Sequence, residues 1–280
     1  MNAYLTTGAF SHRKNVIFPF LQNDDKLSLV SALLIAFKST TMKSFFIFLL
    51  ILLSLAINAQ TTSPDTSKFV LAAKLALDLD GAKHAYHPNN EGIDYNLNGG
   101  INQTEATQNR FAKTGNRGYG IAKKLSPDKS FYVGYLQEDG YFVSQTTVYD
   151  KTKTEGDPDR YADAEVIPYI AISPMWKSKG IKLGDIAYVI DLDNRKEFAA
   201  IFADARNNDD EVEISLALAN GLNIPVTTKM TKSYDGKKDV KKFVGVKNNH
   251  LKIFYFPHSG DGNGKTPAEI EATGKALMHH

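Results

Sequence analysis

Apolar residues between Phe131 and Phe256 occur in short runs separated by turn residues, a pattern that predicts β-strands. The runs are rich in Val, Ile, Phe and Tyr, and Gly, Asn or Asp lies between several of them. They span Phe131–Tyr135, Tyr141–Tyr149, Ile167–Ile172, Ile186–Ile190, Phe198–Phe202 and Ile253–Phe256. Many strands and few helices predict a mainly β (α+β) fold: a single-domain, small β-barrel-like core with a few short helices, a sandwich being the alternative.

Two segments have the signals of short helices. Ser215 is a suitable N-cap for a helix that runs from Leu216 to Gly221, and Gly221 is suited to the C-terminal cap. The second begins at Thr266–Pro267, with Thr as N-cap, Pro in the first turn and Glu269 as the capping-box partner.

The N-terminal part has the pattern of a leader rather than of a folded domain. A lysine after Met42, the apolar run Phe45–Ile57 and the small residue Ala59 predict a secretory signal peptide over residues 42–59. As a helix the run rises about 20 Å, less than the roughly 30 Å hydrocarbon core, so we expect no stable membrane anchor. Residues 1–41 are then an upstream extension outside the true translated chain, or else a long first region of the signal. The predicted product is secreted or periplasmic.

Composition excludes several classes of function. The chain of 280 residues has no cysteine, which rules out thiol catalysis, thiolate metal sites and redox motifs. A formal net charge of +2, close to neutral once the leader is left out, predicts no nucleic-acid partner. The four lysines in Lys237–Lys242 are interpreted as a solvated turn and strand edge. His84 and His87 near Asp80 are interpreted as part of a loop, so no metal site is predicted.

The candidate chemistry lies in an acidic segment. Asp204 follows an apolar strand, and Glu213 precedes the helix expected at Ser215. Two carboxyl groups across a cleft are what glycoside hydrolysis needs, since one donates a proton to the leaving oxygen and the other activates water. The alternative is a solvated acidic turn in which Glu213 favours the helix N-terminus.

Several segments, in order along the chain, carry a family resemblance. They are Asp78–Ala82 with Ala85–Pro88 and Gly92–Asn96, then Tyr141–Thr147, Tyr161–Ile170, Lys182–Ala187, Ala200–Asp204 and Glu213–Ala219. Together they resemble the chitosanases of glycoside hydrolase family 75. The resemblance covers nearly all of residues 60–280, which we expect to form the catalytic domain.

The resemblance implies an endo-acting, inverting enzyme without a cofactor, whose essential carboxylates are Asp204 and Glu213. We expect Asp204 to be the general acid, buried with a raised pKa, and Glu213 the general base, although the two roles could be reversed. Inversion implies carboxyl groups roughly 6.5 to 9.5 Å apart. The chain departs from the family pattern at Ala203, around Arg206, and at Val212.

The expected partner is chitosan or a related amino-sugar polysaccharide, bound by a monomer. An acidic cleft attracts its protonated amines, and tyrosines supply faces for sugar rings. The candidate binding residues are Asp78, Asp80, Tyr86, Tyr141, Asp185 and Arg206; Trp176 is a further stacking candidate, and Asp209, Asp210 and Glu211 are further charges. Two other functions stay open: a carbohydrate-binding protein that has lost catalysis, and a hydrolase of another amino-sugar polymer such as peptidoglycan.

Overall fold

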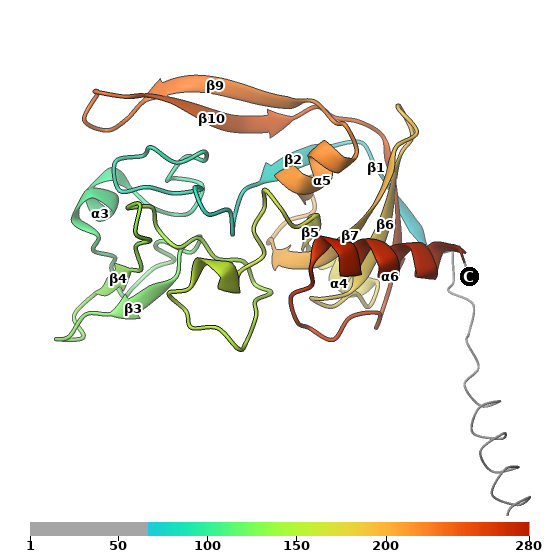
Figure 1. The fold of residues 1–280 in the computed structure, drawn as a ribbon, viewed down its shortest axis with the longest axis horizontal. Helices are drawn as coiled ribbons and strands as arrows, with labels where there is room; N and C mark the ends of the chain where they lie inside the picture. Colours follow the sequence, from blue (N-terminus) through green and yellow to red (C-terminus); the bar gives the residue numbers. More distant parts are fainter. Residues whose placement is uncertain (1–66, 280) are drawn as a thin grey trace, which may run out of the picture. The chain divides into compact units, whose positions relative to one another are not determined.

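A seven-stranded sheet organises residues 67–279, the part of the chain that the computed structural model describes (Figure 1). The strand order is β1-β11-β6-β7-β5-β8-β2. The strands are β1 (Phe69–Ala72), β2 (Leu75–Asp78), β5 (Tyr169–Ile172), β6 (Ile186–Asp191), β7 (Glu197–Ala205), β8 (Val212–Ser215) and β11 (Leu251–Phe256). The sheet curls into a half-barrel, and helices are few and short. The mainly β (α+β) fold class is therefore confirmed.

Both faces of the sheet are covered, which explains why its central strands are apolar at nearly every position. On β7, Ala199 and Ile201 pack in a cluster with Ile270 of helix α6 (Pro267–His279). The alternate residues Ala200 and Phe202 pack in a second cluster on the opposite face. Helices α4 (Pro174–Ser178) and α5 (Leu216–Gly221) contribute to that second cluster.

Residues 79–165 form a loop-rich region with little regular structure. It holds helix α3 (Gln103–Gln108), the short pair β3 (Lys123–Leu125) and β4 (Tyr132–Gly134), and the 3-10 turn η1 (Pro158–Arg160). The predicted strand Tyr141–Tyr149 is wrong, because this segment makes only isolated bridges. Its apolar residues Phe142 and Val143 are buried for a different reason: they pack in the core beneath the loops.

A long hairpin, β9 (Val226–Lys232) and β10 (Asp239–Val246), runs along the loop-rich region and past β2 (Figure 1). The sequence analysis predicted only a turn and a strand edge at Lys237–Lys242, because the two strands are rich in Lys and Thr and lack a clear apolar alternation. The interpretation of its lysines as solvated is wrong for Lys242, whose side chain is fully buried.

The predicted helix starts are confirmed. Ser215 Oγ accepts a hydrogen bond from the Leu218 N–H at 3.1 Å, and Thr266 and Glu269 form the reciprocal capping box at the start of α6. The cap assigned to Gly221 is wrong: Gly221 is the last helical residue, Leu222 is the C-cap, and Asn223, with φ of 55°, takes the left-handed position.

The predicted leader and the upstream residues 1–41 lie outside the described residues. Within residues 67–279, none of the helices is long and apolar enough to cross a bilayer.

Candidate active site

The sheet register brings Asp204 and Glu213 into one row. Asp204 on β7 is the partner of Ala171 on β5, and Ile170 on β5 is the partner of Ile214 on β8. Because β5 and β8 are antiparallel, one step along the pair places Ala171 opposite Glu213. The two acids are thus separated by a single strand, with Cα atoms roughly 10 Å apart. Side chains of residues directly across a sheet share a face, so both carboxyl groups point to the same side.

A β-bulge decides which face Asp204 uses. Phe202 pairs with Ile170 and Asp204 with Ala171, so β7 holds one extra residue, Ala203. Without it, Asp204 would alternate onto the face of Phe202, inside the second apolar cluster. The bulge turns the carboxyl group to the face that bears Tyr169, toward the loop-rich region.

Two further carboxylates come from β2, which pairs in parallel with β8. Ala76 is the partner of Glu213, and Asp78 lies two residues further, hence on the same face. The Asp80 N–H donates to Asp78 Oδ1 at 2.9 Å. Carboxylate oxygens of Asp78, Asp80 and Asp204 all lie within 4.8 Å of one another.

Burial makes this cluster hold protons above the usual carboxyl range. Asp204 is 8% exposed, and desolvation raises its pKa, while hydrogen bonds from Thr147 and from the Ala205 N–H oppose the shift. Desolvation followed by the nearby charge of Asp204 raises the pKa of both Asp78 and Asp80 well above the usual value. Carboxyl groups this close titrate as a group and share protons.

Arg206 places a positive charge beside Glu213. Its Nε lies 3.7 Å from Glu213 Oε2, and its Nη1 donates to the backbone carbonyl of Glu211 at 2.9 Å, which closes the 206–211 loop. Burial raises the pKa of Glu213, and the Arg206 charge opposes that rise. Glu213 is therefore the member of the pair that a neighbouring cation helps to keep ionised.

Tyr86 and Asp94 extend the acidic cluster. The Tyr86 hydroxyl donates to Asp80 Oδ1 at 2.6 Å and lies 3.2 Å from Asp94 Oδ2. Burial raises the pKa of Asp94 to about 6. Because the hydroxyl has a single proton, its donation is shared between the Asp80 and Asp94 carboxylates, and it favours the ionised form of both.

These groups open into a cleft of about 1240 Å³ between the sheet and the loop-rich region. Its lining holds six carboxylates against three basic side chains: Asp78, Asp80, Asp94, Glu155, Asp204 and Glu213 against Lys123, Arg160 and Arg206. An adjoining hollow of about 520 Å³ shares Asp94 and Asn98 with it and continues along β2 and β10. The cleft is acidic, although the whole chain is nearly neutral.

The structure brings Asp78, Asp80, Tyr86 and Arg206 into this cleft with Asp204 and Glu213, but not the other predicted residues. Tyr141 lies outside the lining and packs edge-on against His84 and His87.

Three polar or aromatic residues predicted to meet the substrate have structural contacts instead. Asp185 is buried and accepts hydrogen bonds from the backbone of Lys182 and Gly260, so it ties two loops together. Trp176 is buried against Phe202 and Tyr255. Asp209 accepts from the Met175 N–H in the first turn of α4.

Tyr86 presents no face to a sugar, since it is 1% exposed and only its hydroxyl serves the site. Tyr119, which the sequence analysis missed, is 45% exposed in the lining and donates its hydroxyl proton to the Asn98 carbonyl. Asp94 and Thr147 were also missed, although both lie in segments that carried the family resemblance. Only their proximity to the carboxylate cluster in the folded chain identifies them.

The cluster has a second chemical capacity. Three carboxylates at this separation can ligate a hard divalent cation such as Ca²⁺ or Mg²⁺. No metal was predicted, and the same oxygens serve equally as a proton-holding group.

Comparison of the chain with models of known protein families and with curated proteins finds no match.

Proposed function

We propose that this protein is an exported, endo-acting chitosanase that hydrolyses β-1,4 glucosaminidic bonds with inversion. The observation that carries the proposal is the row Asp204–Ala171–Glu213, which points two carboxyl groups, one of them beside Arg206, into one acidic cleft. The ordered resemblance to family 75 chitosanases supports the same function.

Asp204 acts as the general acid. It donates its proton to the glycosidic oxygen while the bond from that oxygen to the anomeric carbon breaks. Glu213, kept ionised with the help of Arg206, takes a proton from the water that attacks the anomeric carbon from the opposite face. Both groups return to their starting states by proton exchange with solvent. A Cα separation of roughly 10 Å leaves room for that water between the carboxyl groups.

Charge and shape favour a cationic polymer as the substrate. Protonated glucosamine amines meet an excess of carboxylates, and Tyr119 offers an exposed ring for a sugar face. The adjoining hollow lets a chain continue past Asp94, which suits cleavage inside a polymer.

The first test is turnover of highly deacetylated chitosan by the wild type, Asp204→Asn and Glu213→Gln, followed by reducing ends and product masses. We expect each variant to lose at least about a thousandfold in kcat with a melting temperature within a few degrees of wild type. Glu138→Gln, in an exposed turn outside the cleft, is the matched control and should keep full activity.

Other outcomes select other functions. Retention on chitosan beads without hydrolysis would indicate a binding protein, and turnover of peptidoglycan alone would indicate a hydrolase of another amino-sugar polymer. Activity that disappears in EDTA and returns with Ca²⁺ would assign the Asp78–Asp80–Asp204 cluster to a cation. A variant at either carboxylate that keeps most of its rate would overturn the assignment of the pair.

A further inference from the structure

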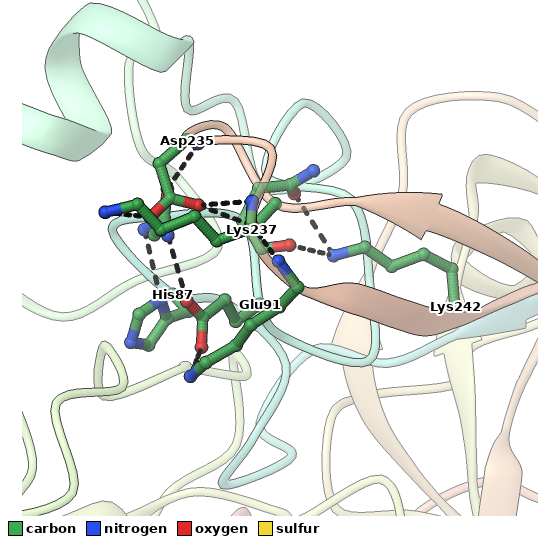
Figure 2. A network of polar contacts seen from close by, with 9 residues as sticks. His87, Glu91, Asp235, Lys237 and Lys242 are labelled. Carbon is green, nitrogen blue, oxygen red and sulfur yellow. Dashed lines mark hydrogen bonds and ion pairs between the residues drawn. The ribbon is translucent and has the colours of Figure 1, made fainter.

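Lys242 is a fully buried lysine whose ammonium group meets backbone oxygens rather than a carboxylate. On β10, its Nζ lies 2.9 Å from the carbonyl oxygen of Asn90 and 2.7 Å from those of Gly92 and Asp94, with Asn90 Oδ1 at 3.1 Å. Figure 2 shows the side chain reaching from the hairpin toward the loop that bears His87 and Glu91. The three protons of the ammonium thus orient three carbonyl groups of the 89–94 loop toward Lys242.

The rest of the hairpin follows the same loop. The Phe243 N–H donates to the Ile93 carbonyl at 2.9 Å, and the Tyr234 N–H donates to the Asn89 carbonyl at 3.0 Å. In the hairpin turn Lys238 forms an ion pair with Glu91. Most of these contacts are replaceable neutral hydrogen bonds or an exposed ion pair, whereas Lys242 is a buried charge.

The loop that Lys242 holds carries part of the candidate site. The Asp94 carbonyl accepts a hydrogen bond from Lys242, and the Asp94 carboxylate lines the cleft. There it lies beside the Tyr86 hydroxyl, which also donates to Asp80. Lys242 is thus three contacts away from the Asp78–Asp80–Asp204 cluster, although it does not line the cleft.

We propose that Lys242 is a positioning residue for the candidate site: its ammonium holds the 89–94 loop so that Asp94 and Tyr86 stay against Asp80. A neutral side chain of the same length would hold the loop only by packing. The inference rests on the proposed function for its effect on turnover, but its effects on the loop and on Asp94 can be measured without substrate.

The groups around Lys242 and Asp94 determine in which direction the pKa of Asp94 changes when the Lys242 charge is removed. Burial lowers the pKa of Lys242 to about 8, and the charge of Asp94 opposes this shift. The ring of Tyr95 lies 5.4 Å from Lys242 Nζ. Lys229 is the cross-strand partner of Lys242. Asp94 is faced by Asn98, Tyr86 and Lys242, and each of them favours its ionised form. Loss of the Lys242 charge therefore raises the pKa of Asp94 further.

The experiment compares Lys242→Met with Lys241→Met, which changes an exposed lysine on the same strand. For Lys242→Met we expect faster amide hydrogen exchange in residues 89–94, a higher Asp94 pKa by carboxyl ¹³C NMR, and roughly tenfold to a hundredfold lower kcat on chitosan. Lys241→Met should change none of the three. If Lys242→Met does not fold, Lys242→Gln replaces it, because Gln keeps donors without the charge.

Unchanged loop exchange and an unchanged Asp94 titration in the neutral variant would overturn the positioning role. An inactive wild type would instead count against the proposed hydrolase, and exchange and titration would still decide the role of Lys242. Loss of melting temperature alone, with normal turnover and titration in the remaining folded protein, would show that Lys242 only stabilises the hairpin.

Discussion

Single residues in this protein gain their chemistry from burial rather than from residue type. Asp204, Asp209 and Asp210 belong to one acidic segment, yet Asp204 is buried beside other acids, whereas Asp209 accepts from the first turn of α4 and Asp210 is exposed. Desolvation raises the pKa of Asp204, whereas hydrogen bonds from Ser173 and from the Met175 N–H lower that of Asp209. The burial of its carboxyl group thus distinguishes the acid of the proposed reaction from the neighbouring aspartates.

The raised pKa of Asp94 predicts a contribution to stability that falls as pH rises. Asp94 ionises at about 6 in the folded protein and near 3.8 when unfolded, so between these values the folded state binds more protons. That group alone should make the protein about 3 kcal/mol less stable above pH 6 than below pH 4. Urea unfolding across pH 4 to 7 measures the slope, and Asp94→Asn should flatten it; a slope unchanged by this substitution would show that Asp94 titrates normally.

At the scale of elements, small departures from regular structure orient the side chains and loops of the candidate site. The bulge at Ala203 turns Asp204 to the functional face, and Gly81 with φ of 80° turns the chain after Asp80 into the loop-rich region. A Cβ at Gly81 would overlap the carbonyl oxygen of Ala162. Alternation predicts neither feature, since one adds a residue to a strand and the other depends on a distant carbonyl.

Gly81→Ala and Gly115→Ala separate the two costs of such a turn. Both glycines have positive φ, but a Cβ at Gly115 meets nothing within 4 Å. We expect Gly115→Ala to cost about 1 kcal/mol for the backbone conformation, and Gly81→Ala at least about 2 kcal/mol more for the overlap. Chemical denaturation gives both values, and equal costs would mean that the Ala162 carbonyl moves aside freely.

At the scale of the whole molecule, the cleft forms where the curled sheet meets the loop-rich region, with the β9–β10 hairpin running along both (Figure 1). Its acidity is a local property, because basic residues such as Lys229, Lys232 and Lys241 lie on the exposed hairpin. A near-neutral chain can therefore still attract a polycation to one face.

This local field predicts salt-sensitive binding of chitosan. Raising the ionic strength from about 0.05 to 0.5 M shortens the screening length severalfold, so we expect KM to rise several-fold while kcat changes little. Steady-state kinetics with a neutral, acetylated oligomer as the control checks this. An equal salt effect on both substrates would show that the cleft charge does not attract the amines.

Much of the fold follows from local signals that need no distant partner. The apolar runs that became β5, β6, β7 and β11, and the caps at Ser215 and Thr266, depend on near neighbours in the chain. Segments whose structure depends on distant partners were missed or misjudged. Tyr141–Tyr149 buries Phe142 and Val143 without a strand ladder, and the Lys-rich hairpin forms hydrogen bonds to the 89–94 loop.

The sequence by itself determined the apolar strands, the helix starts and the pair of acids, Asp204 and Glu213, nine residues apart. Only the tertiary structure decided that these acids share a row across β5, that Asp78 and Asp80 lie within 4.8 Å of Asp204, that Asp94 joins them, and that Asp185 and Tyr141 do not. The reason is physical: strand propensity and capping act over a few residues, whereas register, bulges and desolvation arise when distant segments pack together.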